Sequence, residues 1–210
     1  IANEVIDALP VRLFALDDAG LRARVVGVDD NGRFTWREIP ADASLTQSAE
    51  SALAALWSAL PRPYRSEVRP MLKPWLAEVT RSMTYGAAWF IDYGYPRAQF
   101  YSQQRSEGTL RCHYRHRAHD DPLAWPGLQD LTAWVDFDDL KRAAGAAGFP
   151  SAVDVTQAQF LFEHGLDAVF SDAYAQTRDE ATRYRLAQEV KRLTLPGQMG
   201  ETVRVAVLRR

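Results

Sequence analysis

Acidic side chains directly follow two short apolar segments that have the character of strands. Glu4 and Asp7 come after Ile1 and Ala2, and Asp92 follows an apolar run over residues 87–91. In open α/β sheets, ligands bind beyond the carboxyl ends of the strands. A carboxylate in that place can accept hydrogen bonds from a ligand, or it can cap a helix or pair with an arginine. Two strands that end in acids over one edge favour a ligand site.

The segments around these acids alternate between strand-like and helix-like patterns, which is typical of an α/β fold. The unbroken apolar run over residues 87–91 fits a parallel strand that is covered on both faces. Further strands are expected at 152–155 and 202–208. Helices are expected at 44–60, 71–83 and 137–147, and further helices are expected between the strand at 152–155 and about residue 193. At the start of the first helix, Ser44 and Gln47 resemble a capping box.

Residues 11–40 are predicted to form an antiparallel β-meander. Three short strand-like runs are separated there by Asp-Asp-Ala-Gly at 17–20 and Asp-Asp-Asn-Gly at 29–32. Both four-residue sequences favour turns, because Asp, Asn and Gly accept the backbone conformations that tight turns need. The meander is therefore expected as an insertion into the α/β fold.

Residues 94–136 are predicted to form a long loop or lid. A loop of this length is usually functional or disordered. Its many aromatic, Arg and His side chains argue against disorder. We predict that it folds over the site, with Tyr93, Tyr95, His116 and His119 facing the cleft. Asp136 precedes a predicted helix and suits its N-terminal cap.

Composition limits the function classes. The 210 residues carry 27 acidic and 25 basic side chains, so no general electrostatic attraction to nucleic acid or to an anionic membrane is expected. No apolar run approaches the length of a membrane span. The single cysteine, Cys112, excludes an intramolecular disulfide framework and suits a reducing compartment.

The segment 112–121 holds a cysteine, three histidines and two aspartates, but we predict no metal site there. The spacing of these residues fits no common zinc pattern, and the arginines between them would repel a cation. The chain also lacks the G-x-S-x-G sequence of a hydrolase nucleophile.

Several stretches resemble the MidA-type methyltransferases, in the same order and over essentially the whole chain. The stretches are NEVIDALPV (3–11), FIDYGY (90–95), GTLRCHYRHRAHDDPL (108–123), PGLQDLTAWVDF (126–137) and QFLFEHGL (159–166). Members of this family are class I enzymes that use S-adenosylmethionine (SAM), and the mitochondrial ones methylate a protein arginine during respiratory complex I assembly. The resemblance implies SAM as cofactor and a Rossmann-like sheet.

Class I methyltransferases hold SAM through a glycine-rich turn after their first strand, where the backbone must approach the cofactor closely. No G-x-G occurs in this sequence. The chain is therefore expected to be the C-terminal portion of the family fold, starting at the end of the fourth strand, with the upstream SAM-binding half missing.

The resemblance also implies roles for individual residues. Asn3 and Glu4 are expected to contact the methionine end of SAM. Glu4 resembles, in position, the acid that other arginine methyltransferases place after the fourth strand, and Asp7 could share its face if residues 5–9 turn helically. Both are predicted catalytic residues. Asp92, Tyr93, Tyr95, His116 and His119 are predicted to bind the substrate.

The resulting hypothesis is a SAM-dependent methyltransferase that acts on a protein, with arginine as the acceptor. The alternative is a non-catalytic assembly factor that keeps the fold and binds a partner protein. The resemblance implies a respiratory-complex subunit as a possible partner. It also implies a cytoplasmic location in a bacterium or a mitochondrial one in a eukaryote.

Overall fold

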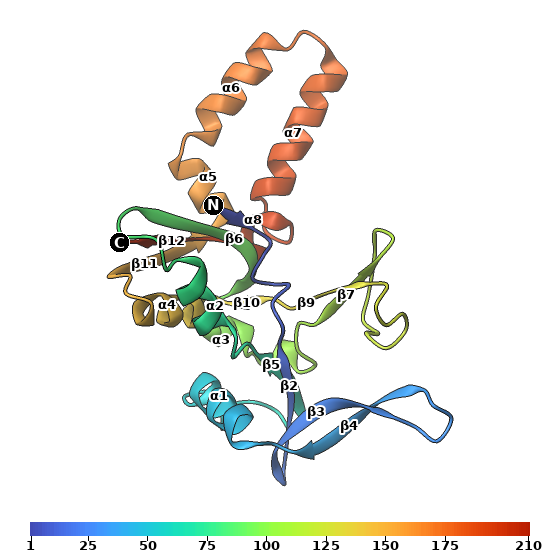
Figure 1. The fold of residues 1–210 in the computed structure, drawn as a ribbon. Helices are drawn as coiled ribbons and strands as arrows, with labels where there is room; N and C mark the ends of the chain where they lie inside the picture. The colour runs from blue at the N-terminus through green and yellow to red at the C-terminus, as the bar shows by residue number, and fades with distance from the viewer.

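The computed structural model describes residues 1–210 and has a mixed sheet at its centre (Figure 1). The strand order is β1 (Ala2–Asn3), β6 (Ala87–Tyr95), β12 (Val203–Arg209) and β11 (Ser151–Thr156). β1 runs parallel to β6, whereas β12 is antiparallel to both β6 and β11. The predicted strands at 87–91, 152–155 and 202–208 are all present in this sheet.

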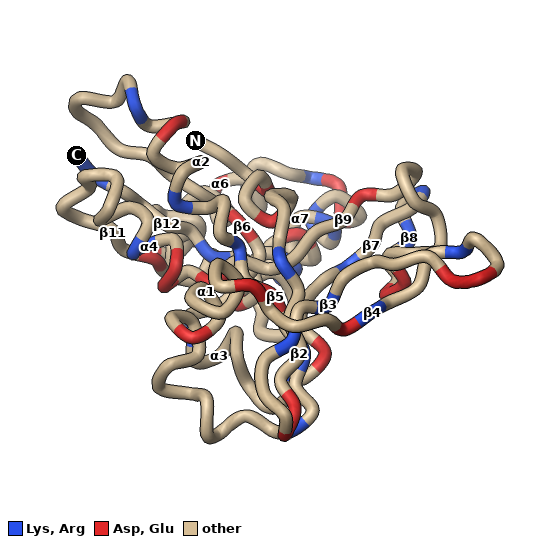
Figure 2. The backbone as a smooth tube through the Cα atoms, turned by 60° about the horizontal axis from the view of Figure 1, so that its bottom comes forward, with Lys and Arg blue, Asp and Glu red and all other residues tan.

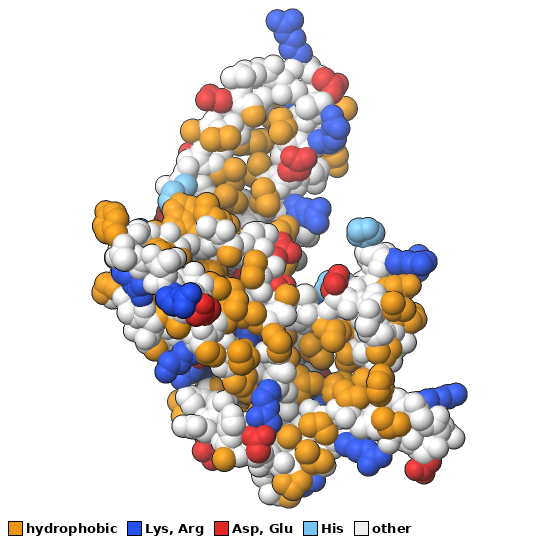
Figure 3. Space-filling view, in the orientation of Figure 1, with side chains coloured by type: hydrophobic (Ala, Val, Ile, Leu, Met, Phe, Trp, Pro, Cys, Tyr) orange, Lys and Arg blue, Asp and Glu red, His pale blue; other side chains and the backbone are white.

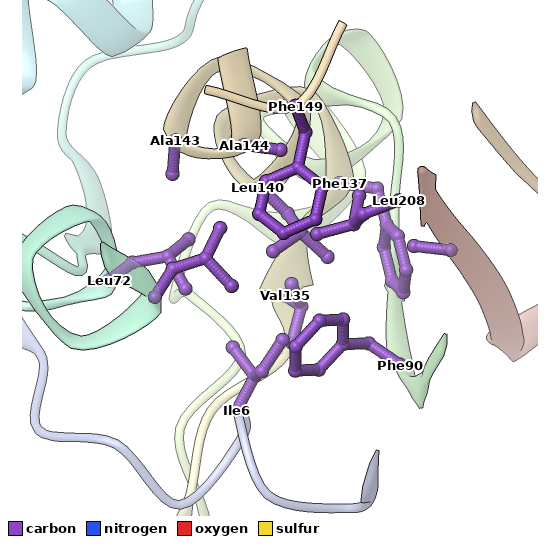
Figure 4. Packing of buried hydrophobic residues seen from close by; sticks show 12 residues of the cluster. Ile6, Leu72, Phe90, Val135, Phe137, Leu140, Ala143, Ala144, Phe149 and Leu208 are labelled. Carbon is purple, nitrogen blue, oxygen red and sulfur yellow. The ribbon is translucent and has the colours of Figure 1, made fainter. Parts of the chain in front are cut away.

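Helices cover both faces of this sheet. On one face, α2 (Leu72–Val79) and α4 (Phe137–Ala146) pack over Phe90 and form a core of twelve buried hydrophobic residues. Ile6 joins this core from the turn after β1 and lies against Phe90 and Val135 (Figure 4). On the other face, α5 (Gln157–Glu163) places Phe160 with its ring 5.4 Å from that of Trp89. Neighbouring strand residues point to opposite faces, so Trp89 and Phe90 each need their own cover.

Asp136 caps α4, as predicted. Its Oδ1 accepts hydrogen bonds from the backbone N–H groups of Asp138 (3.0 Å) and Asp139 (3.1 Å). These groups have no partner within the helix, and an acidic side chain at the N-terminus also favours the helix dipole.

A second sheet contains the predicted meander. Its order is β4 (Phe34–Pro40), β3 (Gly20–Val28), β2 (Arg12–Asp17) and β5 (Tyr64–Val68), with all pairs antiparallel. Helix α1 (Ala43–Leu53) packs on it and helps to form a second core. The predicted capping box at Ser44 is wrong: Asp42 caps α1 by accepting a hydrogen bond from the Leu45 N–H at 2.8 Å. The helix also ends at Leu53, earlier than expected.

Residues 94–136 contain regular structure and are not a plain loop. After α3 (Arg97–Phe100) and the short 3-10 helix η1 (Gln103–Arg105), three strands form a separate sheet in the order β8-β7-β9. These strands are β7 (Arg111–Tyr114), β8 (Arg117–His119) and β9 (Asp130–Thr132). They are short and mostly exposed, and the sequence shows no apolar alternation there. A tight hairpin pairs β7 with β8, and β9 joins β7 from further along the chain.

The last part of the chain contains a helical hairpin. Helices α6 (Leu166–Gln176) and α7 (Glu180–Thr194) project from the main sheet, and the short α8 (Met199–Thr202) leads into β12 (Figure 1). Neither α6 nor α7 contains a buried residue. No helix combines the length and the apolar character that crossing a bilayer requires.

Strand β6 continues beyond Asp92, so the expectation that this strand ends at Asp92 is wrong. Strand β10 (Val135–Asp136) pairs in parallel with Gly94 and Tyr95 and extends the ladder. The close approach depends on a glycine, because a Cβ on Gly94 would lie 2.0 Å from the carbonyl oxygen of Val135. Asp92 therefore lies inside the strand.

We expect Gly94→Ala to lower the free energy of unfolding by about 3 kcal/mol, because the new methyl group would displace backbone atoms of β10. Gly145→Ala is the matched control. It lies in α4 with nothing within 4 Å of the added Cβ, and it should raise stability by about 0.5–1 kcal/mol. Urea denaturation of both variants measures the difference, and equal effects would contradict the close-approach argument.

Candidate active site

The turn after β1 is held by the buried carboxylate of Asp92. Oδ2 of Asp92 accepts hydrogen bonds from the backbone N–H groups of Val5 (3.2 Å), Ile6 (2.9 Å) and Asp7 (3.3 Å). Oδ1 accepts one from its own neighbour, Tyr93, at 2.9 Å. Asp92 is 1% exposed. The sequence predicts that Asp92 binds the substrate, whereas in the structure all four hydrogen bonds that its oxygens accept come from the protein backbone.

Arg69 holds the same turn from the other side. Its guanidinium donates to the carbonyl oxygens of Asp7, Leu9, Ala133 and Trp134. The Ala133 N–H also donates to the Asp7 carbonyl at 3.0 Å. Arg69 is 7% exposed and forms no direct ion pair. A buried cation is tolerated only with such a set of acceptors, so the turn and the segment before β10 are bound into one unit.

Asp7 and Glu4 differ in their surroundings. Asp7 is 8% exposed, and burial raises the pKa of its carboxyl, with a smaller contribution from the charge of Glu4. Glu4 is exposed and has a φ of 50°, a left-handed conformation that is uncommon for a residue with a side chain. The Asn3 side-chain amide donates to Glu4 Oε1 at 3.3 Å. Strain of this kind often marks functional sites.

The segment after Glu4 is a tight turn and not a helix. The Leu9 N–H donates to the carbonyl of Ile6 at 3.0 Å, and no helical ladder follows. Residues 5–9 therefore do not meet the condition, a helical turn, under which Asp7 would share the face of Glu4. The two acids are nevertheless close enough for the charge of Glu4 to act on Asp7.

The charge of Asp7 acts on the buried carboxyl of Asp92. Burial raises the pKa of Asp92 to about 6, and the charge of Asp7 adds to the shift. The backbone N–H groups of Ile6, Tyr93 and Asp7 lower it in part. Two carboxylates in one partly buried region resist being charged together.

The other predicted substrate residues are dispersed. Tyr93 is half-buried beside Glu4, and burial, followed by the charge of Glu4, raises the pKa of its hydroxyl. Tyr95 instead packs on Trp134 and stacks under Arg105, whose guanidinium lies 4.1 Å from the ring centroid. His116 lies in the exposed turn between β7 and β8. His119, on β8, packs on Trp125 in the connection between β8 and β9.

Two residues near the acids were missed by the sequence reasoning. Arg69 directly follows β5 and belongs to none of the sequence motifs described above. His113 on β7 lies close enough for its charge to lower the pKa of Asp7. Strand β7 pairs with β9, and β9 leads into Ala133, whose N–H donates to the Asp7 carbonyl. This pairing brings His113 close to Asp7. The sequence points to His113 only as one of three histidines in the segment 112–121, and it does not distinguish His113 from His116 and His119.

The wider surface carries both signs of charge. Acidic and basic residues are spread over all parts of the chain (Figure 2). No cluster of three or more His, Cys, Asp or Glu side chains has an arrangement suited to a metal ion. The ionisable side chains at the turn itself are those of Glu4 and Asp7, with the half-buried Tyr93 beside them.

Comparison with known proteins identifies the family. Residues 1–153 match the family described as "Putative S-adenosyl-L-methionine-dependent methyltransferase". The chain belongs to this family. The resemblance inferred from the sequence motifs is thus confirmed, and SAM is the cofactor of the family.

Curated relatives include the mitochondrial protein arginine methyltransferase NDUFAF7 of cattle and of humans. The bovine protein is 31% identical over 203 residues, which cover 96% of this chain and 43% of the bovine protein. The human protein is 30% identical over 203 residues, which again cover 96% of this chain and 43% of the human protein. The chain thus spans less than half the length of these relatives.

Two solved structures from Burkholderia thailandensis have the same fold. One is an uncharacterised superfamily protein, 36% identical with a TM-score of 0.87, over 99% of this chain and 54% of that chain. The other has S-adenosyl-homocysteine bound and is 37% identical with a TM-score of 0.88, over 99% of this chain and 52% of that chain. These matches confirm the predicted fold class.

We expect the stability of the protein to depend on pH through Asp92. The folded state keeps the Asp92 proton up to a pKa of about 6, whereas the unfolded chain releases it near 3.8. The folded state then binds more protons between these values, so the free energy of unfolding falls as pH rises from about 4 to about 6. The contribution is at most about 3 kcal/mol.

Thermal unfolding of Asp92→Asn across this pH range tests the assignment. The variant should lose this part of the pH dependence, and Asp18→Asn in an exposed turn should keep it. An unchanged slope in Asp92→Asn would mean that other groups cause the effect.

Proposed function

We propose that the protein is a SAM-dependent protein methyltransferase whose acceptor is an arginine side chain. The observation that carries this proposal is the turn after β1, where Asp92 and Arg69 hold the exposed Glu4 next to the nearly buried Asp7. Family membership and the named activity of the NDUFAF7 relatives support it.

The reaction requires orientation more than activation. SAM supplies a methyl group on a sulfonium, and a guanidinium nitrogen attacks that methyl group as the S–C bond breaks. The guanidinium is a poor nucleophile because its charge is delocalised and it stays protonated in proteins. A carboxylate can bind its planar fork through paired hydrogen bonds and direct one nitrogen. Glu4 is the exposed carboxylate in the position to do so.

Asp7 is the group suited to receive a proton. The methylated nitrogen releases one proton as the N–C bond forms. A base near neutral pH is most effective when its pKa lies close to the working pH, and burial moves the pKa of Asp7 upward in that direction. Asp7 therefore acts after or during transfer, whereas Glu4 orients the acceptor.

The residues at the end of β1 fit one part of SAM. The exposed Asn3 amide and the Glu4 carboxylate offer oxygens to the ammonium of its amino-acid end. The chain offers no glycine-rich turn for the nucleoside end. Asn3 and Glu4 would thus form one wall of the cofactor site.

The substrate side rests on Tyr93 and on the lid formed by residues 94–136. Tyr93 lies beside Glu4, while His116 and His119 would contact substrate only at the outer part of the lid. A respiratory-complex subunit as substrate rests on the family resemblance alone. So does a bacterial cytoplasmic location, whereas the curated relatives are mitochondrial by name.

We expect Glu4→Gln in the full-length protein to reduce methyl transfer by on the order of a hundredfold or more, the scale of losing one transition-state contact. SAM affinity should stay within a few-fold, because the amide keeps the shape and one acceptor. Transfer of a labelled methyl group from SAM to protein and calorimetry of SAM binding measure the two effects.

Glu50→Gln is the matched control, because Glu50 is an exposed acid on α1. It should leave both quantities unchanged. Near-normal turnover in Glu4→Gln would leave Glu4 a structural residue. Absence of any methyl transfer by the wild-type protein would favour the assembly-factor alternative.

A comparison of two histidines tests the lid. We expect His113→Ala to move the acidic limb of the pH profile of kcat/KM to higher pH, because the positive charge that lowers the pKa of Asp7 is lost. His116→Ala, in the exposed β7–β8 turn, should leave this limb in place and weaken only the binding of a protein substrate. If neither variant changes binding or the profile, the small sheet takes no part in the reaction.

A further inference from the structure

A long groove separates the meander sheet from the small β7–β9 sheet. It consists of two hollows of about 540 Å³ and 620 Å³. The hollows share the lining residues Leu13, Arg24, Trp36, Leu110 and Pro122, so they are continuous. Figure 3 shows hydrophobic side chains gathered between the two sheets. We call this feature the inter-sheet groove.

The part of the groove nearest the acids is apolar. It begins at Asp7, and twelve of its eighteen lining residues are hydrophobic, among them Leu9, Val25 and Leu131. Leu131 is 46% exposed. A contiguous exposed apolar surface of this kind is a typical binding surface for another molecule.

The junction of the two hollows carries the cation of Arg24, whose cross-strand neighbour Glu38 is shared with another arginine. The guanidinium of Arg24 stacks on Trp36 at 4.4 Å from the ring centroid and forms no ion pair. Its nearest acids, Glu38 and Glu107, both pair with Arg65. The hydroxyl of Ser66, which is 3% exposed, lines one of these two hollows and has no hydrogen-bond partner. The guanidinium of Arg24 and the unpaired hydroxyl of Ser66 can together bind a negatively charged group.

The span from Asp7 to Arg24 can be covered by a short extended peptide. Asp7 lines the apolar hollow, and Arg24, which pairs with Leu13 across β2 and β3, lies where the two hollows meet. Leu13 comes six positions after Asp7, so the distance between them is at most about 20 Å at the rise of an extended chain. An extended segment of about six residues spans it.

We propose that the inter-sheet groove binds an extended segment of the protein substrate, with the target arginine at Asp7, apolar residues in the middle and an acidic residue at Arg24. This proposal rests on the proposed function, because it places the acceptor arginine at the acids. Charge complementarity supports this occupant. The carboxylate of Asp7 suits a cation of the segment, and the guanidinium of Arg24, which forms no ion pair, suits an anion.

Binding of labelled synthetic peptides to the full-length protein tests the proposal. The peptide GRGVLVGDG carries the three features, and GDGVLVGRG carries them in the reverse direction. GRGVLVGKG reverses the distal charge, and GRGSSSGDG removes the apolar residues. Fluorescence polarisation should give at least one acidic peptide a roughly tenfold tighter Kd than the Lys and Ser peptides, the scale of one favourable charge contact or one apolar cluster.

A charge reversal then locates the acidic contact. Arg24→Glu should reverse the preference, so that GRGVLVGKG binds more tightly than GRGVLVGDG, and Arg24→Gln should abolish it. Arg33→Glu, in the exposed turn of the same hairpin, should leave the preference unchanged. Thermal unfolding checks that each variant is folded, and Arg24→Gln serves if Arg24→Glu is not.

The outcomes separate the two proposals. Equal affinity of the acidic, Lys and Ser peptides, an unaltered preference in both Arg24 variants, or no binding at millimolar peptide would overturn the groove proposal. A groove that is occupied by another part of the protein or by a second copy would give one of these overturning results. The expected binding pattern without methyl transfer from labelled SAM would keep the groove and refute arginine methylation. Methylation without the pattern would do the reverse.

Discussion

The hydrogen bonds from three consecutive backbone N–H groups to the carboxylate of Asp92 are the interaction on which the site depends. They fold the chain back immediately after β1 and so place Glu4 at the surface and Asp7 in a nearly buried position. Ile6, between them, packs into the core with Phe90 and Val135. The polar anchor and the apolar side chain act together, because a buried carboxylate is tolerated only when its oxygens are satisfied.

Arg69 extends this unit to the rest of the molecule. Its guanidinium binds carbonyls of the turn after β1 and of the segment before β10, so one side chain holds these two parts of the chain together. The same arrangement sets the electrostatics, since Asp7 and Asp92 are close, partly desolvated and shifted toward protonation. Active sites commonly carry such perturbed carboxylates. The groove that starts at Asp7 places a surface for a protein segment next to them.

The sequence alone determined the class of fold and the family. The meander between residues 11 and 40, the apolar strand β6, the Val-rich strand β12 and the Asp136 cap follow from local patterns, because turn residues, apolar runs and capping acids act over a few positions. The motif stretches determined the family resemblance. The pair Glu4 and Asp7 was visible for the same reason, since both residues follow one strand.

Only the tertiary structure decided what each side chain does. Asp92 looked like a ligand residue at a strand end, but β10 pairs beyond it and the turn after β1 takes its oxygens. Strand β7 pairs with β9 from further along the chain, and this pairing places His113 near Asp7, while His119 packs on Trp125. Arg69 and the groove are likewise products of contacts between segments far apart in the chain. Hydrogen bonds and burial of this kind depend on three-dimensional neighbours, which local sequence patterns do not specify.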